Sequence, residues 1–192
     1  KKLEKNKKLI NKKTLSVKTS FPNSKKIYIN SKKFKNVNVP MREISLSDNE
    51  IKNIVVYDTS GSYSDPNINH DYESGLKKLR QEWIKTRTGI SLSQKENLKF
   101  LNHSKTVEPF PNITQSIFKK KGKDEITQLF YARNNIITEE MEFCAIRENE
   151  GRERLIGEKF KKEDLVTAEF VRKQIALGEA IIPSNINHTE LE

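Results

Sequence analysis

Along the chain, the spacing of apolar residues changes from alternation to helical periods, and this order constrains the fold more than any other feature. Three short β-rich segments come first, at residues 26–29, 37–39 and 53–57. Thr138 and Thr167 then precede two segments in which apolar residues recur every three to four positions. Short strands followed by capped helices are typical of α+β proteins. We therefore predict an α+β domain over residues 21–178, with a small mixed sheet and at least three packed helices.

The three predicted helices each have an apolar stripe and a polar residue that can cap the first turn. Ser74 precedes Leu76, Leu79 and Trp83, which recur at i, i+3 and i+7. Thr138 precedes Met141, Cys144 and Ala145, and Thr167 precedes a face made of Phe170, Val171, Gln174 and Ile175, with Gly178 just beyond it. These patterns predict helices over residues 74–85, 139–149 and 167–177, and they place Trp83 in the core.

The remaining segments are predicted from shorter patterns. Pro40 is expected to end the second strand or to lie at a sheet edge, because proline cannot donate a ladder hydrogen bond. The apolar run 53–57 predicts a buried strand that leads into a turn at Asp58–Gly61. Residues 89–124 are polar and poorly periodic, which predicts a loop or insertion. Alternation predicts a strand over residues 126–132 and a short strand over residues 180–183.

The net charge of +10 is concentrated at one end of the chain. Residues 1–40 contain 13 Lys and one acidic residue, so the remainder carries a net charge of −2. We interpret residues 1–20 as a basic disordered arm with little to bury. A solvated arm is the simpler interpretation, and an arm that binds nucleic acid or a protein partner is the alternative, because lysine runs without interleaved aromatic residues or arginine are a weak nucleic-acid signal.

Composition excludes several classes of protein. No stretch approaches the roughly 18 consecutive apolar residues of a membrane span, and residues 1–13 lack the apolar core of a secretory signal. Cys144 is the only cysteine, which excludes an internal disulfide framework and a metal cluster held by cysteines of this chain alone. Apolar residues make up 34% of the chain, so the core is expected to be thin.

Few residues are candidates for chemistry. His70 and His103 are interpreted as exposed loop residues, Cys144 as a buried and inert thiol, and Asp58–Gly61 as a plain turn because it lacks the spaced glycines of a phosphate loop. Asn185, Asn187 and His188 follow an apolar segment, as site residues at a strand end would, although a polar linker that leads out of the domain is the favoured interpretation. The residues alone therefore predict no catalytic, cofactor-binding or metal residue in this chain.

Several segments together carry a resemblance to a known family. They are Phe21–Tyr28, Val39–Ile44, Val56–Gly61, Gly75–Ile84, Tyr131–Asn149, Glu169–Arg172, Ala180–Pro183 and Asn185–Glu190. In this order and spacing they resemble the N-terminal portion of the phosphomethylpyrimidine synthase family of thiamine biosynthesis. Ser62 and Ser64, on either side of Tyr63, and the stretch from about 89 to 112 depart from the family pattern.

The resemblance implies a radical S-adenosylmethionine lyase that converts aminoimidazole ribotide into hydroxymethylpyrimidine phosphate. It implies a 4Fe–4S cluster, S-adenosylmethionine and a divalent metal (zinc) in the full-length protein, a homodimer, and a cytoplasmic or plastid location, with no membrane partner. The family's cluster cysteines, its metal-binding histidines and its β/α barrel follow the segment seen here, so residues 179–192 are expected to be a first strand or a linker into that barrel.

No family site residue maps onto this chain, which is therefore expected to be inactive and to bind no cofactor alone. The sequence leaves open an excerpt, a broken gene or one half of a split enzyme. The competing hypothesis is a non-catalytic interaction module. An enzyme part should expose a large apolar patch that packs on the barrel, whereas an independent module should be a stable monomer whose binding falls steeply with salt.

Overall fold

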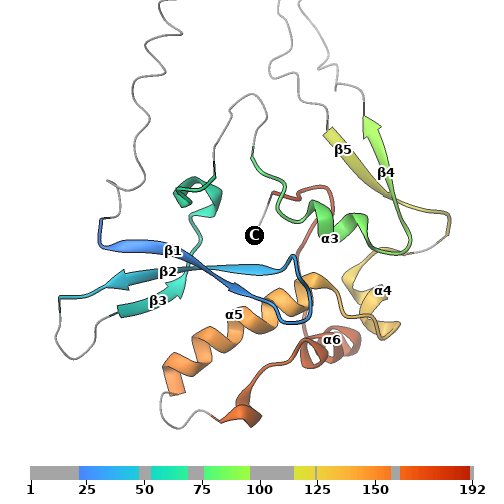
Figure 1. The fold of residues 1–192 in the computed structure, drawn as a ribbon. Coiled ribbons are helices and arrows are strands. Elements are labelled where there is room, and N and C mark those ends of the chain that lie inside the picture. The colour runs from blue at the N-terminus through green and yellow to red at the C-terminus, as the bar shows by residue number, and fades with distance from the viewer. Residues whose placement is uncertain are drawn as a thin grey trace, which may run out of the picture.

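The computed structural model describes residues 22–47, 53–68, 76–95, 115–123, 125–156 and 161–190. The predicted basic arm at 1–20, the candidate cap Ser74, and the histidines His70 and His103 lie outside these residues. Within them the fold combines strands and helices, as the sequence predicts, but two small antiparallel sheets stand in place of the one mixed sheet expected, together with four α-helices (Figure 1).

A three-stranded sheet forms the N-terminal part, with β1 (Ser24–Asn30), β2 (Asn38–Ser45) and β3 (Asn53–Tyr57) in that spatial order. Pro40 neither ends β2 nor lies on an edge strand, so that expectation is wrong. In the register of β1 with β2, Ser31 donates its N–H to Val37 and Ser45 donates to Asn23. Hydrogen bonds to β1 therefore fall on odd-numbered positions of β2, and the nitrogen of Pro40 faces the other side, beyond the last β2–β3 pair at Tyr57.

The third strand is confirmed in its bounds and wrong in its predicted burial. β3 is an edge strand, and Ile54 is 37% exposed. The apolar run that suggested a buried strand is covered on one face only, by the long helix α5 (Glu139–Ile156). The turn that follows β3 is confirmed, since the Asp58 carboxylate accepts the N–H of Ser60 at 2.8 Å before a short 3₁₀ helix over Gly61–Ser64.

The first predicted helix is much shorter than the apolar stripe suggests. α3 spans only Gln81–Lys85, and Leu76 and Leu79 precede it. Arg80 donates its N–H to the carbonyl oxygen of Thr189 at 2.8 Å instead of to a carbonyl four residues earlier. At Arg80, this long-range hydrogen bond takes the place of one within a helix, and α3 begins at the next residue, Gln81. Trp83 is buried as predicted, with 6% of its surface exposed.

Two further segments differ from their predicted structure. Residues 90–95 and 115–120, expected in a loop, pair as the antiparallel strands β4 (Ile90–Lys95) and β5 (Gln115–Lys120). The predicted strand over 126–132 is instead the helix α4 (Gln128–Arg133). Thr127 caps it, because its hydroxyl accepts the N–H of Phe130 at 3.1 Å, and this local cap overrides the alternating pattern.

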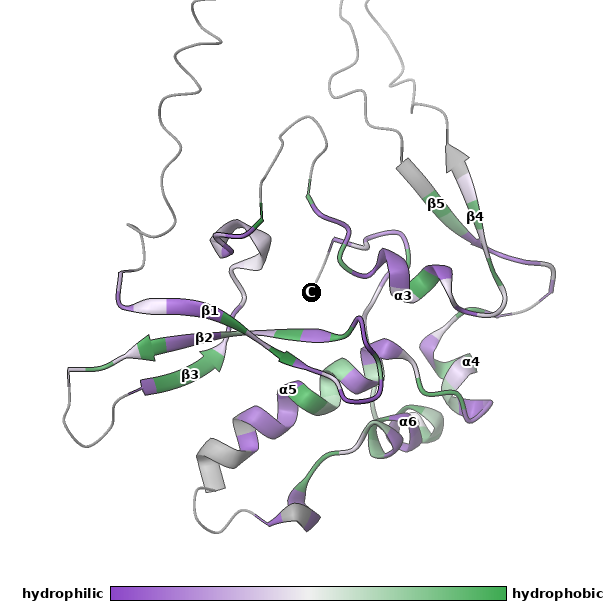
Figure 2. Ribbon diagram, viewed as in Figure 1, coloured by the Kyte–Doolittle hydropathy of each residue, from purple (hydrophilic) through white to green (hydrophobic). Residues whose placement is uncertain are grey.

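The two C-terminal helices are confirmed. α5 extends beyond the predicted end to Ile156, and Figure 2 shows hydrophobic residues in its N-terminal half. α6 (Ala168–Leu177) has the predicted Thr167 cap and ends at Gly178 in the left-handed region, with φ 82°. Its buried face differs from the predicted one, since it consists of Ala168, Arg172 and Ile175, while Phe170 is 51% exposed.

The apolar core lies where α4, α5 and α6 meet (Figure 1). Ala132, Met141 and Ile175 form its centre, and Ala180 and Ile182 pack against it from the segment after α6. That segment, predicted as a strand over 180–183, has no strand hydrogen bonds to any described residue. The burial of its side chains alternates, since Ile182 faces the core while Ile181 is 84% exposed.

Candidate functional site

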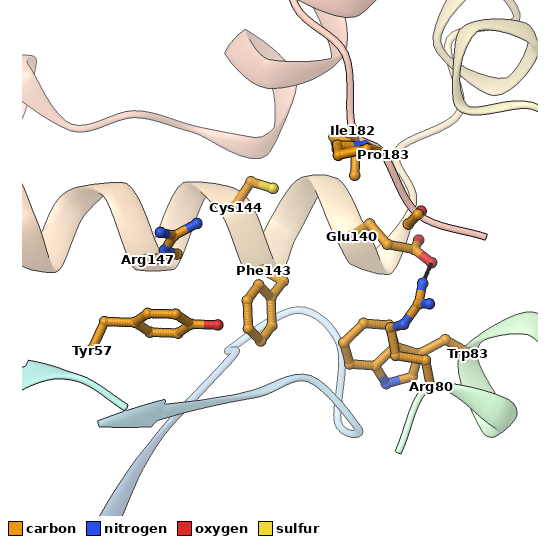
Figure 3. Close-up of a pocket in the computed structure, with 10 residues that line it drawn as sticks. Tyr57, Arg80, Trp83, Glu140, Phe143, Cys144, Arg147, Ile182 and Pro183 are labelled. Atoms are coloured by element: carbon orange, nitrogen blue, oxygen red, sulfur yellow. Dashed lines mark hydrogen bonds and ion pairs between the residues drawn. The ribbon is translucent and has the colours of Figure 1, made fainter. Parts of the chain in front are cut away.

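A cavity of about 270 Å³ lies between the sheet, α3, α5 and the segment after α6 (Figure 3). Its walls are mainly aromatic, with Tyr57 from β3, Trp83 from α3 and Phe143 from α5. The Phe143 ring lies 6.4 Å from Tyr57, edge to face, and 6.1 Å from Trp83, so one helical residue joins the two other rings. The indole N–H of Trp83 points away to the carbonyl of Asn36, at 2.9 Å.

Arg80 and Glu140 close one end of the cavity with a buried ion pair, at 3.4 Å (Figure 3). Glu140 also binds Arg87, which pairs in turn with Glu139 at 2.8 Å. Two arginines thus face two glutamates. Burial lowers the pKa of Arg80, whereas the two glutamates outweigh burial at Arg87 and raise its pKa. The formal charges of the two arginines and the two glutamates cancel.

Arg80 also holds the last described turn of the chain, residues 185–190. Its Nη2 donates to the carbonyl oxygens of Asn185 at 3.0 Å and His188 at 2.6 Å, and its backbone N–H donates to Thr189. We call this set of three hydrogen bonds the Arg80 clamp. The turn is fastened a second time at Asn187, whose side-chain amide accepts the N–H of Phe118 in β5 at 2.7 Å and donates to its carbonyl at 3.2 Å.

At the other end of the cavity, the guanidinium of Arg147 lies 4.4 Å above the ring of Tyr57. Among the residues that the structure describes, Arg147 has no hydrogen bond and no ion pair. Cys144, one helical turn earlier, is half-buried against the cavity. Burial raises the pKa of its thiol, and the charge of Arg147 offsets this in part. A raised pKa disfavours the reactive thiolate, which agrees with the predicted inert thiol, although the residue is half-buried and not buried as predicted.

Two protein-family models match the chain. Residues 20–91 match the ThiC-associated domain, and residues 127–192 match the radical SAM ThiC family. The two matches follow one another along the chain and together cover 138 of its 192 residues. The chain belongs to the radical SAM ThiC family. The predicted resemblance to the N-terminal portion of phosphomethylpyrimidine synthase is thereby confirmed, and this family indicates a radical SAM enzyme of thiamine biosynthesis.

The Arg80 clamp joins the two matched regions of this ThiC-family chain. Arg80 and Arg87 belong to the ThiC-associated domain, while Glu139, Glu140 and the turn at 185–190 belong to the radical SAM region. The contact between the two regions thus includes a neutral cluster of four buried charges and several bonds to backbone carbonyls. The sequence does not identify Arg80 or Arg87 as a site residue, because an isolated arginine beside an apolar stripe is usually exposed to solvent.

The three polar candidates at the end of the ThiC chain lie in this turn. Asn185 accepts the N–H of Asn187 at 2.8 Å, which stabilises the turn locally. Asn187 binds the backbone of β5. The side chain of His188 is 61% exposed and lies 3.2 Å from Glu190. Each of the three is exposed and also has a contact within the fold.

The single cysteine of the ThiC chain does not fit the family's iron–sulfur cluster, and the described side chains do not form a zinc site. A 4Fe–4S cluster of a radical SAM enzyme needs three thiolates, whereas the sequence has one cysteine, whose thiol is held neutral by burial. In the parts of the chain that the structure describes, no three His, Cys, Asp or Glu side chains come together as metal ligands. None of the helices described there combines the length and apolar character that crossing a bilayer requires.

Proposed function

We propose that this chain is the N-terminal part of a phosphomethylpyrimidine synthase, the lyase that converts aminoimidazole ribotide into hydroxymethylpyrimidine phosphate. The observation that carries the proposal is the pair of consecutive family matches over residues 20–91 and 127–192. In this proposal the cluster, S-adenosylmethionine and zinc are bound by residues of the full-length protein outside this chain, on the β/α barrel that the resemblance implies. The full-length protein would be a cytoplasmic or plastid homodimer.

The part of this chain in that enzyme would be to position the segment that leads into the barrel. The Arg80 clamp and the Asn187 bonds hold residues 185–190 against both the ThiC-associated domain and β5. Because backbone carbonyls are bound as well as side chains, the path of the main chain is fixed there. The chain would contribute orientation to the enzyme and no proton-transfer or redox group of its own.

Exposed apolar side chains support a further packing partner. Leu177 is 70% exposed at the end of α6 and Ile181 is 84% exposed in the segment after it, with Phe170 at 51% on the same helix. Large apolar side chains that gather on one part of a surface are characteristic of interfaces. A barrel that follows residue 192 would be the covering element in the full-length enzyme.

Growth complementation tests the proposal. The full-length gene is expressed in a bacterium that cannot make the pyrimidine half of thiamine, beside a gene for residues 1–192 alone. We expect the full-length gene to restore growth without added pyrimidine, and the 192-residue chain to fail. The purified full-length protein, loaded with iron and sulfide under anaerobic conditions, should consume aminoimidazole ribotide and S-adenosylmethionine. A soluble, cluster-loaded protein that consumes neither would overturn the proposal.

A further inference from the structure

The hairpin of β4 and β5 has two edges, and one of them is already occupied. Residues 92–126 lie between the two family matches, and Figure 1 shows the hairpin extending away from the three-stranded sheet. In the register of the two strands Leu92 lies opposite Phe118, and Phe118 binds the side chain of Asn187 through both its N–H and its carbonyl. Even-numbered positions of β5 therefore point away from β4, and Asn187 occupies that edge near its middle.

The outer edge of β4 pairs with no other strand among the described residues. Lys121 donates its N–H to the carbonyl of Gly89 at 2.7 Å, so the hydrogen bonds between the two strands fall on odd-numbered positions. The N–H and carbonyl groups of Leu92 and Gln94 are consequently directed outward. The described side chains of β4, at residues 90–93, carry no charge, although charged side chains commonly protect edge strands. This edge can therefore accept another strand.

The two faces of the hairpin predict which side chains an added strand would carry. Leu92 is 49% exposed on the even-numbered face, beside the buried Phe118. On the odd-numbered face Ser91 lies opposite Lys119, and both Lys119 and Lys121 are exposed. Because side chains of a strand alternate between the two faces, a partner strand would place apolar residues beside Leu92 and acidic residues on the lysine face.

The charge of the hairpin favours an acidic partner over a second copy of this chain. Residues 115–125 contain four Lys and two acidic residues. Lys120 pairs with Glu125 at 3.4 Å, whereas Lys119 and Lys121 have no ion pair within the described part of the chain. An added strand would lie two strand spacings, about 10 Å, from Lys119, and the Debye length in physiological salt is about 8 Å. An acidic strand would thus still be attracted, while two copies paired through β4 would bring two basic hairpins together.

We propose that the outer edge of β4 binds an extended acidic segment of a partner protein, in which acidic and apolar residues alternate, as a third strand of the β4–β5 sheet. Backbone hydrogen bonds to Leu92 and Gln94 would supply the affinity, and the side chains of Leu92 and Lys119 the preference for the alternating pattern. This binding does not depend on the radical reaction proposed above. Because Asn187 joins β5 to the turn at 185–190, the partner would be held close to that turn.

A synthetic peptide of eight residues that alternates glutamate and valine is the probe. It carries a fluorophore, and titration with the 192-residue protein should raise its anisotropy saturably. A peptide with the four glutamates first and the four valines last should bind at least about tenfold more weakly, because it cannot place acidic and apolar side chains on opposite faces. Residue-resolved hydrogen exchange should become slower at Leu92 and Gln94 and stay unchanged at Ser91 and Ser93, whose N–H groups already bond to β5.

Two pairs of variants separate strand addition from general attraction to a basic chain. Leu92→Pro and Leu92→Ala both remove the leucine side chain, but only proline also removes the outward N–H, at a position where an edge strand tolerates it. Leu92→Pro should therefore bind at least about fivefold more weakly than Leu92→Ala. Lys119→Gln should weaken binding about two- to fivefold, whereas Lys173→Gln, on the exposed surface of α6, should bind like the wild type. Protection of the Ser91 and Ser93 amides checks that the hairpin of each variant is folded.

Four results would each overturn the proposal. The first is no saturable binding, or equal affinity for the two peptides. The second is equal affinity of Leu92→Pro and Leu92→Ala. Should Leu92→Pro fail to fold, unchanged exchange at Leu92 and Gln94 in the peptide-bound wild type excludes the edge in its place. The third is equal loss in Lys119→Gln and Lys173→Gln, which would show binding by net charge only. The fourth is a single-stranded oligonucleotide that binds more tightly than the alternating peptide and equally well to Leu92→Pro, which would assign the lysine face to nucleic acid.

Discussion

The region around α4–α6 and the junction around Arg80 lie a short distance apart and are stabilised by different physics. Ala132, Met141 and Ile175 form a small apolar core that excludes water. At the junction, buried arginines meet glutamates and backbone carbonyls, and each guanidinium has several partners. Apolar packing tolerates small displacements, whereas a buried charge requires each partner in place. The difference suggests that the core provides stability, while the junction sets how the two matched regions are oriented.

Removal of Arg80 should break the junction and have the largest effect. Arg80→Met leaves the carbonyls of Asn185 and His188 without this donor and Glu140 with one arginine fewer. Loss of one partner of a buried ion pair typically costs about 3–5 kcal/mol. We expect the free energy of unfolding in urea to fall by that amount. Arg133→Met is the matched control, and equal, small changes in the two variants would contradict the importance of the clamp.

Truncation of Met141 should destabilise the core, with a loss of unfolding free energy comparable to or smaller than that of Arg80→Met. Its side chain is fully buried among Ala132 and Ile175. Met141→Ala should lower the free energy of unfolding by about 2–5 kcal/mol, the range for a large apolar side chain removed from a core. The same urea titrations measure it. An unchanged midpoint would mean that the core contributes little and that the junction dominates stability too.

Asn187 allows a sharper test of the second fastening. Asn187→Ala leaves the N–H and carbonyl of Phe118 without this amide, which should cost about 1–3 kcal/mol. Asn187→Asp keeps an acceptor for the N–H of Phe118 and loses only the donor, so it should cost less. Thermal unfolding compares the two. A larger effect of the aspartate variant would contradict this expectation, because repulsion between its carboxylate and the Phe118 carbonyl would then outweigh the hydrogen bond that it accepts.

Acid should destabilise the three-stranded sheet through protonation of Asp58, which pairs with Lys26 and Arg42. Burial raises the pKa of this carboxyl, but the hydrogen bonds from Ser60 and the charges of Lys26 and Arg42 outweigh burial and hold it below its ordinary 3.8. A group with a lowered pKa stabilises the fold fully above the unfolded value and loses that contribution as pH falls through the folded value. Stability should therefore drop below about pH 3.8. Asp58→Asn should flatten that part of the urea-midpoint profile, and an unchanged slope would contradict the assignment.

The sequence predicts well the helices that pack in the apolar core, and it predicts poorly the elements that depend on long-range polar contacts. The positions of α5 and α6 follow from their apolar periodicity and threonine caps, although the buried face of α6 is not the predicted one. α3 is misjudged, since the hydrogen bond from Arg80 to Thr189 joins residues 109 apart in the chain. β4 and β5 are missed because their pairing spans the segment between them and their faces are mostly polar.

In the candidate site, too, the apolar residues can be predicted from the sequence, whereas the long-range polar contacts cannot. Trp83 is predicted in the core from its stripe, and Cys144 as an inert thiol from its place on α5. Nothing in the sequence shows that Arg147 stacks on Tyr57, since the two residues lie on different elements. Asn185, Asn187 and His188 are singled out together, and the structure gives the first two contacts that stabilise the turn or fasten it to β5. Long-range polar contacts leave no periodic signal in the sequence. The core residues can therefore be predicted from the sequence, whereas the contacts of the junction around Arg80 cannot.

Hydrogen exchange of Arg80→Lys, compared with the wild type, tests most directly that the clamp holds residues 185–190 against the ThiC-associated domain. Lysine keeps the charge but cannot reach two carbonyls and Glu140 with a fixed fork. We predict faster exchange at Arg80, Asn187 and His188, with unchanged protection in β1, β2 and the first half of α5. Unchanged exchange at residues 185–190, or an equal increase over the whole chain, would contradict the account.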